Sequence, residues 1–308
     1  MDLATFPTTF FVETVMACNL KCPECAIGGE ITARPKSIMR YDDFLIISDK
    51  IRPYAKYVLL HMWGEPLMNN DIFRMIENVS SYASVNISTN ALLLDVAKAE
   101  CLINSGVSDL IVSIDGVSQP VYSLYRVGGI ASRALNNLKL LSRINQRYGR
   151  RVNITPQMIV FDHNYHEIQT FEAICLELGL TPSYKAPYIR NKNSKFKASA
   201  DPKYQRSTYS NRDDLIQAVS TCSDPRNVFT VTVTGDVVLC CHDYDAEIKF
   251  GNILEKNSTV PIIWLSENCM KIRSDIISGN PCNFCTSKCM SYVLTDDYPI
   301  GTTFSSRA

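Results

Sequence analysis

The stretch Cys18-Asn-Leu-Lys-Cys-Pro-Glu-Cys25 sets Cys18, Cys22 and Cys25 at a C-x₃-C-x₂-C spacing, directly after the apolar run 10–15. Three thiolates this close are expected to surround one face of a metal centre at the end of a strand. Thiolates suit zinc or iron–sulfur clusters. A structural zinc site closes with four ligands, and no fourth Cys or His follows nearby. An iron–sulfur cubane also takes four thiolates, so three leave one iron open to a ligand that is not protein. A zinc knuckle, or cysteines without a shared role, is the alternative.

This spacing after a first strand resembles that of the radical SAM superfamily. The resemblance implies a 4Fe–4S cluster whose open iron binds the amino and carboxylate groups of S-adenosyl-L-methionine (SAM). It also implies an external electron donor, such as flavodoxin or ferredoxin, that reduces the cluster. The reduced cluster then splits SAM to methionine and a 5′-deoxyadenosyl radical, which removes hydrogen from an unactivated carbon.

The composition is that of a globular chain of one large or two ordinary domains. Of 308 residues, 31 are Lys or Arg and 31 are Asp or Glu, so the chain has no net charge that would favour binding to nucleic acid or to a membrane. The start of the chain has no basic n-region, and no apolar run approaches the length of a membrane span. Twelve cysteines without an export signal indicate metal ligation in a reducing compartment. We therefore expect a cytoplasmic protein that binds neither nucleic acid nor a membrane.

Short apolar runs alternate with longer amphipathic ones over residues 1–190. This alternation predicts parallel βαβ units. Six units fit a partial TIM barrel, (β/α)6, and in such barrels the chemistry lies at the carboxyl ends of the strands. The expected strands are 10–15, 57–62, 85–89, 109–114, 152–160 and 182–188, and the expected helices are 41–51, 71–82, 94–105, 131–148 and 165–178.

Further motifs follow the expected strands. The stretch HMWGEPL, 61–67, resembles the glycine-glycine-glutamate-proline loop of the superfamily, with Trp63 in place of the first glycine. By this resemblance Trp63, Gly64 and Glu65 contact the methionine amino group of SAM. The resemblance also assigns Ser88 and Asn90 (ISTNALLL, 87–94), Ser113 and Asp115 (VSIDG, 112–116) and Arg126 to the two ends of the cofactor. Singly, a Ser or Asp at a strand end is more often a helix N-cap. Gln157 and Met158 are further expected lining residues, Met158 with a core position as the alternative.

Residues 191–214 are polar and predict a linker or an active-site loop with solvated Lys and Arg side chains. Strict alternation over 229–234, the turn Gly235-Asp236 and a return over 237–239 then predict a β-hairpin. Residues 215–308 are therefore expected to form a small cysteine-rich α+β domain.

The tail pattern C-x₁₂-G-x₄-C followed by C-x₂-C resembles the SPASM domain and its shortened relative, the twitch domain. The resemblance implies an auxiliary 4Fe–4S cluster held by Cys222, Cys240, Cys282 and Cys285. A second auxiliary cluster would need an open or non-cysteine ligand, and a structural zinc site is the alternative for the tail. Three thiols are then left over in the tail, Cys241, Cys269 and Cys289. Cys101 and Cys175, in amphipathic helical stretches, are expected to be buried.

The resemblance implies a radical SAM enzyme of oxidoreductase or epimerase type. An auxiliary cluster that accepts the substrate electron would give oxidation, whereas a thiol that donates hydrogen would give epimerisation, and Cys241 is the candidate donor. Because adjacent side chains of a strand point to opposite faces, Cys241 is expected to face away from Cys240. A packed thiol without a catalytic role is the alternative for Cys241. The chain begins its first strand by residue 10, which we interpret as the absence of a leader-peptide module. We therefore expect a small polar metabolite, such as a sugar or aminocyclitol. The alternatives are a ribosomally made peptide with a separate leader-binding partner, and a non-catalytic iron–sulfur scaffold.

Overall fold

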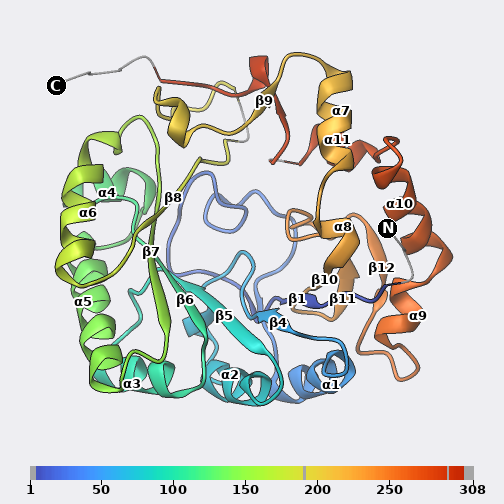
Figure 1. Cartoon of the computed structure of the whole chain (residues 1–308), viewed down its shortest axis with the longest axis horizontal. Helices are drawn as coiled ribbons and strands as arrows, with labels where there is room; N and C mark the ends of the chain where they lie inside the picture. Colours follow the sequence, from blue (N-terminus) through green and yellow to red (C-terminus); the bar gives the residue numbers. More distant parts are fainter. Residues whose placement is uncertain (1–4, 190–191, 290, 302–308) are drawn as a thin grey trace.

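Six parallel strands form the wall of a partial barrel (Figure 1). The computed structural model describes residues 5–189, 192–289 and 291–301. Each barrel strand pairs in parallel with the next, and all six correspond to strands expected from the sequence. They are β1 (Thr9–Val12), β4 (Tyr57–Leu59), β5 (Ser84–Thr89), β6 (Asp109–Ser113), β7 (Asn153–Ile159) and β8 (Ser183–Lys185).

Helices cover the outside of these strands (Figure 1). All five expected helices are present, each with one apolar face turned to the strands. The short helix α4 (Gln119–Tyr125) was not expected, because seven residues are too few for a clear helical period. The others are α1 (Tyr41–Ile51), α2 (Ile72–Ser80), α3 (Val96–Asn104), α5 (Ala131–Arg147) and α6 (Ile168–Glu177).

The predicted hairpin is present, and it extends the barrel sheet. Strand β10 (Val228–Val231) pairs in parallel with β1, β11 (Asp236–Val238) returns antiparallel to it, and β12 (Lys249–Asn252) follows. The result is one sheet of nine strands among the described residues. Strand β10 thereby covers an edge of β1 that would otherwise expose unpaired backbone groups. The fold class is confirmed, while the division into 1–190, 191–214 and 215–308 stays a prediction.

The C-terminal region contains a second, smaller core. Cys240 and Cys285 belong to this core, together with Leu215, Ile276 and Phe284. The helices of this region are α7 (Arg212–Ser220), α8 (Asp224–Asn227), α9 (Val260–Trp264), α10 (Glu267–Ile277) and α11 (Asn283–Ser287), of which α7, α10 and α11 contribute to the second core and α9 packs in the main core. Two further sheets consist of two short strands each. In one, β2 (Val15–Met16) pairs with β3 (Ser37–Ile38), and in the other, β9 (Thr208–Tyr209) pairs with β13 (Val293–Leu294). Short 3-10 helices lie at Pro66–Met68, Tyr165–Glu167, Pro202–Tyr204 and Thr295–Asp297.

One expectation about burial was wrong: Cys101 is exposed on α3, whereas Cys175 is buried as expected. The segment 192–211 packs onto the molecule through the buried Phe196 and Tyr204. Its lysines are exposed as expected, and only Arg206 departs from the expectation, because it bonds to backbone carbonyls. Within the described ranges, no helix has the length and apolarity to cross a bilayer.

Candidate functional site

The three cysteines of the first motif lie around one cavity at the carboxyl ends of the barrel strands. Cys18, Cys22 and Cys25 line this cavity of about 230 Å³, which we call the barrel cavity. The loop that carries them is closed by the bond from Cys25 N to Cys22 O, 3.1 Å. Two N–H groups reach Cys18 Sγ: Leu20 N at 3.4 Å and Asn90 Nδ2 at 3.8 Å. Burial raises the pKa of Cys18 to about 11, and the Leu20 N–H opposes that rise. Three cysteines around one cavity fit an iron–sulfur cluster with three protein ligands.

Glycine is required at two places in this site because backbone segments touch there. A Cβ at Gly28 would lie 2.4 Å from Cys22 N, and one at Gly64 would lie 2.2 Å from Val15 O. Glu65 N then donates to Ala17 O at 2.9 Å. The loop 61–67 therefore packs directly on the start of the cysteine loop. Gly64 also lines the barrel cavity, and its contact with SAM stays a prediction.

Trp63 connects the barrel cavity with the C-terminal region. Its Nε1 donates to Cys241 O at 2.7 Å, and its ring meets Tyr244 edge-on at 5.6 Å. Trp63 O lies 3.9 Å from Cys25 Sγ. The tryptophan that replaces the usual glycine thus reaches from one group of cysteines to the other. No local signal in the sequence indicates this contact.

Glu65 uses its carboxylate to hold two strand ends together. It accepts bonds from Thr89 Oγ1 at 2.6 Å, Asn90 N at 2.8 Å and Leu67 N at 3.2 Å. Burial raises the pKa of Glu65, and these donors oppose that rise. The contact of Glu65 with a cofactor remains a prediction.

Seven of the eight residues expected to bind the cofactor line the barrel cavity. The exception is Asp115, which is fully buried behind it and accepts from Arg126 Nε and from Ile159 N, 2.7 Å. Burial lowers the pKa of Arg126, whereas the Asp115 carboxylate raises it. The resulting pKa of Arg126 lies well above its ordinary value. Asp115 therefore holds Arg126 in place and keeps it charged. The seven are Trp63, Gly64, Glu65, Ser88, Asn90, Ser113 and Arg126.

The helix-cap alternative does not hold for these polar residues, because the N-caps of α3 and α4 are Asp95 and Ser118. Gln157 lines the barrel cavity as expected, whereas Met158 is fully buried in the core. Sequence analysis missed Lys185 and Tyr188, which also line the cavity. Lys185 ends the last barrel strand, which is the position where a functional side chain is expected in this architecture.

The cysteines of the tail lie around a second cavity of about 300 Å³, which we call the tail cavity. Cys222 follows α7, Cys240 follows β11, and Cys285 lies on α11. Cys282 Sγ lies 3.7 Å from Cys285 Sγ, although Cys282 does not line the cavity itself. Cys289 does line it. Cys285 and Cys289 are therefore two candidates for the fourth ligand of the auxiliary cluster. Cys269 is buried on α10 away from this cavity.

Cys240 and Cys241 line the same cavity, contrary to expectation. Opposite faces were expected because side chains alternate along a strand. However, β11 ends at Val238, and Cys241 already belongs to a turn. Alternation therefore does not apply at these positions, and Cys241 is a neighbour of the expected ligands.

Neither group of thiols forms a ready cage for a single ion. In the described part of the chain, no three His, Cys, Asp or Glu side chains converge in the way that one metal ion requires.

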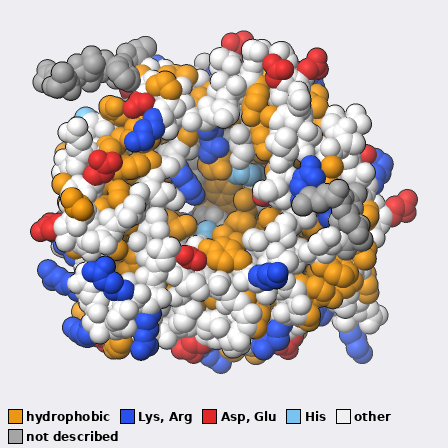
Figure 2. Space-filling model, in the orientation of Figure 1, with side chains coloured by type: hydrophobic (Ala, Val, Ile, Leu, Met, Phe, Trp, Pro, Cys, Tyr) orange, Lys and Arg blue, Asp and Glu red, His pale blue; other side chains and the backbone are white. Residues whose placement is uncertain are grey.

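Several contacts join the surroundings of the two cavities. Besides the Trp63–Cys241 bond, Arg34 Nη1 donates to Tyr244 O at 3.2 Å, Thr32 Oγ1 donates to Asp245 Oδ1 at 2.7 Å, and Tyr188 OH lies 3.4 Å from His242 Nε2. Figure 2 shows the molecule hollowed at its centre, with Lys, Arg and His side chains in the wall of the hollow. The residues around the barrel cavity and those around the tail cavity are thus in direct contact.

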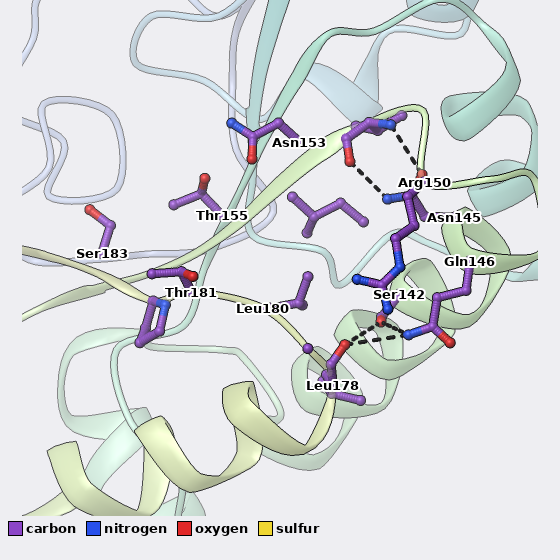
Figure 3. A pocket seen from close by; sticks show the side chains of 14 residues that line it. Ser142, Asn145, Gln146, Arg150, Asn153, Thr155, Leu178, Leu180, Thr181 and Ser183 are labelled. Carbon is purple, nitrogen blue, oxygen red and sulfur yellow. Dashed lines mark hydrogen bonds between the residues drawn. The ribbon is translucent and has the colours of Figure 1, made fainter.

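A further hollow of about 380 Å³ lies near the amino ends of β7 and β8 (Figure 3). Its polar groups bond to each other and to the backbone: Asn145 Nδ2 donates to Val152 O at 2.8 Å, and Ser142 Oγ to Leu178 O at 3.1 Å. No cysteine or carboxylate lines it. These side chains hold two loops together at the end of the barrel that serves stability.

Two family models match the chain. The model described as "Radical SAM superfamily" matches residues 12–173, and the model described as "Iron-sulfur cluster-binding domain" (SPASM) matches residues 222–290. The first covers more than half of the chain.

Curated relatives match about half of the chain. AdoMet-dependent heme synthase of Methanosarcina barkeri is 29% identical over 170 residues, which is 54% of this chain and 46% of that protein. PqqA peptide cyclase of Granulibacter bethesdensis is 27% identical over 141 residues, 46% of this chain and 37% of that protein. The matches thus span less than half the length of either relative.

One similar solved structure is BtrN in complex with AdoMet and 2-DOIA. The TM-score is 0.56 at 17% identity, and the match covers 94% of this chain and 93% of that one. This likeness concerns the fold alone.

Proposed function

This chain belongs to the radical SAM superfamily and carries a SPASM-type iron–sulfur domain, and from this premise we propose that it abstracts hydrogen from a carbon of a small polar metabolite. The product would arise by oxidation or by epimerisation. The observation that carries the proposal is the connection between the two groups of cysteines through Trp63 and Cys241. A substrate held between them would meet hydrogen abstraction on one side and electron or hydrogen transfer on the other.

Membership implies a 4Fe–4S cluster, SAM and an auxiliary iron–sulfur cluster as cofactors. When bound, the first cluster and SAM supply a 5′-deoxyadenosyl radical. Cys18, Cys22 and Cys25 would hold that cluster, with Leu20 N and Asn90 Nδ2 stabilising Cys18 as a thiolate. Cys222, Cys240, Cys282 and Cys285 would hold the auxiliary cluster, Cys289 being the competitor for the fourth position. A reductant such as flavodoxin or ferredoxin would supply electrons.

The side chains of the barrel cavity would bind and orient the cofactor. Arg126, kept charged by Asp115, suits a carboxylate because a guanidinium offers several donors in one plane. Ser88, Asn90 and Ser113 suit hydroxyl or carboxylate groups. The packed segment 192–211 would exclude water from a reactive intermediate, and Ser194 Oγ donates to Glu24 Oε1 at 2.6 Å, where this segment meets the cysteine loop.

The barrel and tail cavities, of about 230 and 300 Å³, are the places proposed for the cofactors, so a substrate would bind between them. A peptide is the second candidate, supported by the similarity to a peptide cyclase, and it would need a separate leader-binding partner.

Anaerobic reconstitution tests the enzyme assignment. With SAM and a strong reductant, the reconstituted protein should release 5′-deoxyadenosine even without substrate. The variant with Cys18, Cys22 and Cys25 all changed to Ala should release none. Release by this variant would overturn the assignment, and no release by the wild type would favour the scaffold alternative.

Turnover in deuterated water distinguishes oxidation from epimerisation. If Cys241 donates hydrogen, the wild type places solvent deuterium on the product carbon, because a thiol exchanges with water. The Cys241→Ser variant would not. Unchanged activity of this variant would instead favour oxidation through the auxiliary cluster.

A further inference from the structure

Lys185 is the last residue of β8, the sixth parallel strand of the barrel. It lines the barrel cavity together with Cys25, Trp63 and Arg126. The side chain is exposed to solvent, yet protein atoms surround it, because it lies inside the hollow and not on the outer surface. The carboxyl end of a barrel strand is the position from which side chains reach a substrate.

Lys185 lacks an acidic partner. Among the described residues, no carboxylate oxygen lies within 4.0 Å of its Nζ, and the ionisable groups around it include Cys241, Arg206, Asp115 and His61. Asp115 is already bonded to Arg126 and to Ile159 N. The hollow therefore contains a lysine that forms no ion pair within the described part of the chain. An anion that enters would be attracted to it.

A second cation, Arg206, lies behind Tyr188, which also lines the barrel cavity. Arg206 stacks on the ring of Tyr188 at 3.6 Å and is fixed by bonds to Pro187 O at 3.0 Å and Ala186 O at 3.3 Å. Tyr188 in turn lies 3.4 Å from His242 Nε2, which lines the tail cavity. Lys185 and Arg206 thus place two cations on the side of the hollow towards Cys241.

The carboxylates that line the two cavities are engaged or lie apart from Lys185. Glu65 accepts three hydrogen bonds, Glu24 accepts from Ser194, and Asp224 lies in the tail cavity close to Cys222. None forms an ion pair with Lys185 in the part of the chain that the structure describes. A negative group on a ligand is the remaining candidate to fill this role.

We propose that Lys185 binds a carboxylate or phosphate group of the substrate between the two groups of cysteines. This inference rests on the proposed function and deepens it by assigning the substrate a negative charge. With its anionic group bound to Lys185 at the end of β8, the substrate would extend between the cysteine loop and Cys241. A cationic amino sugar would be repelled by Lys185, so an acidic or phosphorylated metabolite replaces the aminocyclitol as the expected substrate.

Four sugars of similar size test the charge preference: glucose 6-phosphate, gluconate, glucose and glucosamine. Their binding to the anaerobically reconstituted, SAM-bound protein is measured by calorimetry. We expect one or both anions to bind at least about tenfold more tightly than the neutral and cationic sugars. Binding of only glucose 6-phosphate would indicate a phosphorylated substrate, and binding of only gluconate an acid.

Variants of Lys185 test whether this residue causes the preference for anionic sugars. Lys185→Gln should remove it, Lys185→Arg should keep most of it, and the matched control Lys203→Gln, an exposed lysine in the segment 192–211, should leave it unchanged. No anion binding to the wild type, or a preference that survives in Lys185→Gln, would overturn the inference. So would a loss of SAM affinity in Lys185→Gln, since Lys185 would then serve the cofactor. Release of 5′-deoxyadenosine, which tests the proposed function, is measured separately in the same preparations.

Discussion

Single buried charges in this protein join segments that are far apart in sequence. Glu13 is fully buried and forms an ion pair with Arg34, and its Oε2 also accepts from Val233 N at 3.0 Å. Arg34 in turn donates to Tyr244 O. Burial raises the pKa of Glu13, and Arg34 opposes that rise. One carboxylate thus connects the barrel, the cysteine loop and the β10–β11 turn.

Glu13→Gln should lower the free energy of unfolding by about 3 kcal/mol, because it leaves the Arg34 guanidinium mostly buried without its counter-charge. Urea unfolding of the anaerobically reconstituted protein measures the change. Asp42→Asn breaks the pair with Arg40, in which both side chains are mostly exposed, and it should have little effect. Equal effects of the two variants would show that the buried pair does not stabilise the fold.

At the scale of elements, the turn after β11 is held against the barrel by a side chain from another loop. The Trp63 indole bonds to Cys241 O at 2.7 Å, at the point where β11 has ended and the chain turns. Trp264 makes a comparable bond from its Nε1 to Thr5 O at 3.0 Å, elsewhere in the molecule. The two tryptophans of the chain therefore form a matched pair for testing one hydrogen bond.

Trp63→Phe keeps an aromatic ring beside Tyr244 and removes only the N–H donor. A lost bond that leaves a carbonyl unpaired costs about 1 kcal/mol or more, so backbone amides in 241–246 should exchange roughly fivefold faster. Hydrogen exchange followed by mass spectrometry measures this rate. Trp264→Phe should leave exchange in 241–246 unchanged. If the two variants behave alike, Trp63 does not restrain this turn.

At the scale of the whole molecule, the two groups of cysteines predict the iron content. The reconstituted protein should hold about eight irons, and the Cys18, Cys22 and Cys25 triple Ala variant about four. Ala at Cys222 or Cys240 should loosen the second cluster, because metal binding is coupled to folding. Iron analysis and electron paramagnetic resonance measure both effects. Loss of iron from Cys289→Ala but not from Cys285→Ala would show that Cys289 is the ligand.

The barrel could be predicted from the sequence because its signals are local. Alternating apolar runs and helical periods depend on neighbouring residues, and the six strands and five helices appeared at the expected places within a few residues. The spacing of Cys18, Cys22 and Cys25 is equally local, since one loop carries all three. The family membership followed from this loop and is shown by the matching models.

Only the tertiary structure decided the contacts between segments far apart in the chain. The pairing of β10 with β1, the bond from Trp63 to Cys241 and the position of Lys185 in the hollow each depend on residues more than one hundred positions apart. A local pattern specifies which face of an element is apolar, but not which distant edge or side chain it will meet. The sequence by itself thus determined the barrel and its cysteine motif, and the tertiary structure decided what lies between the two groups of cysteines.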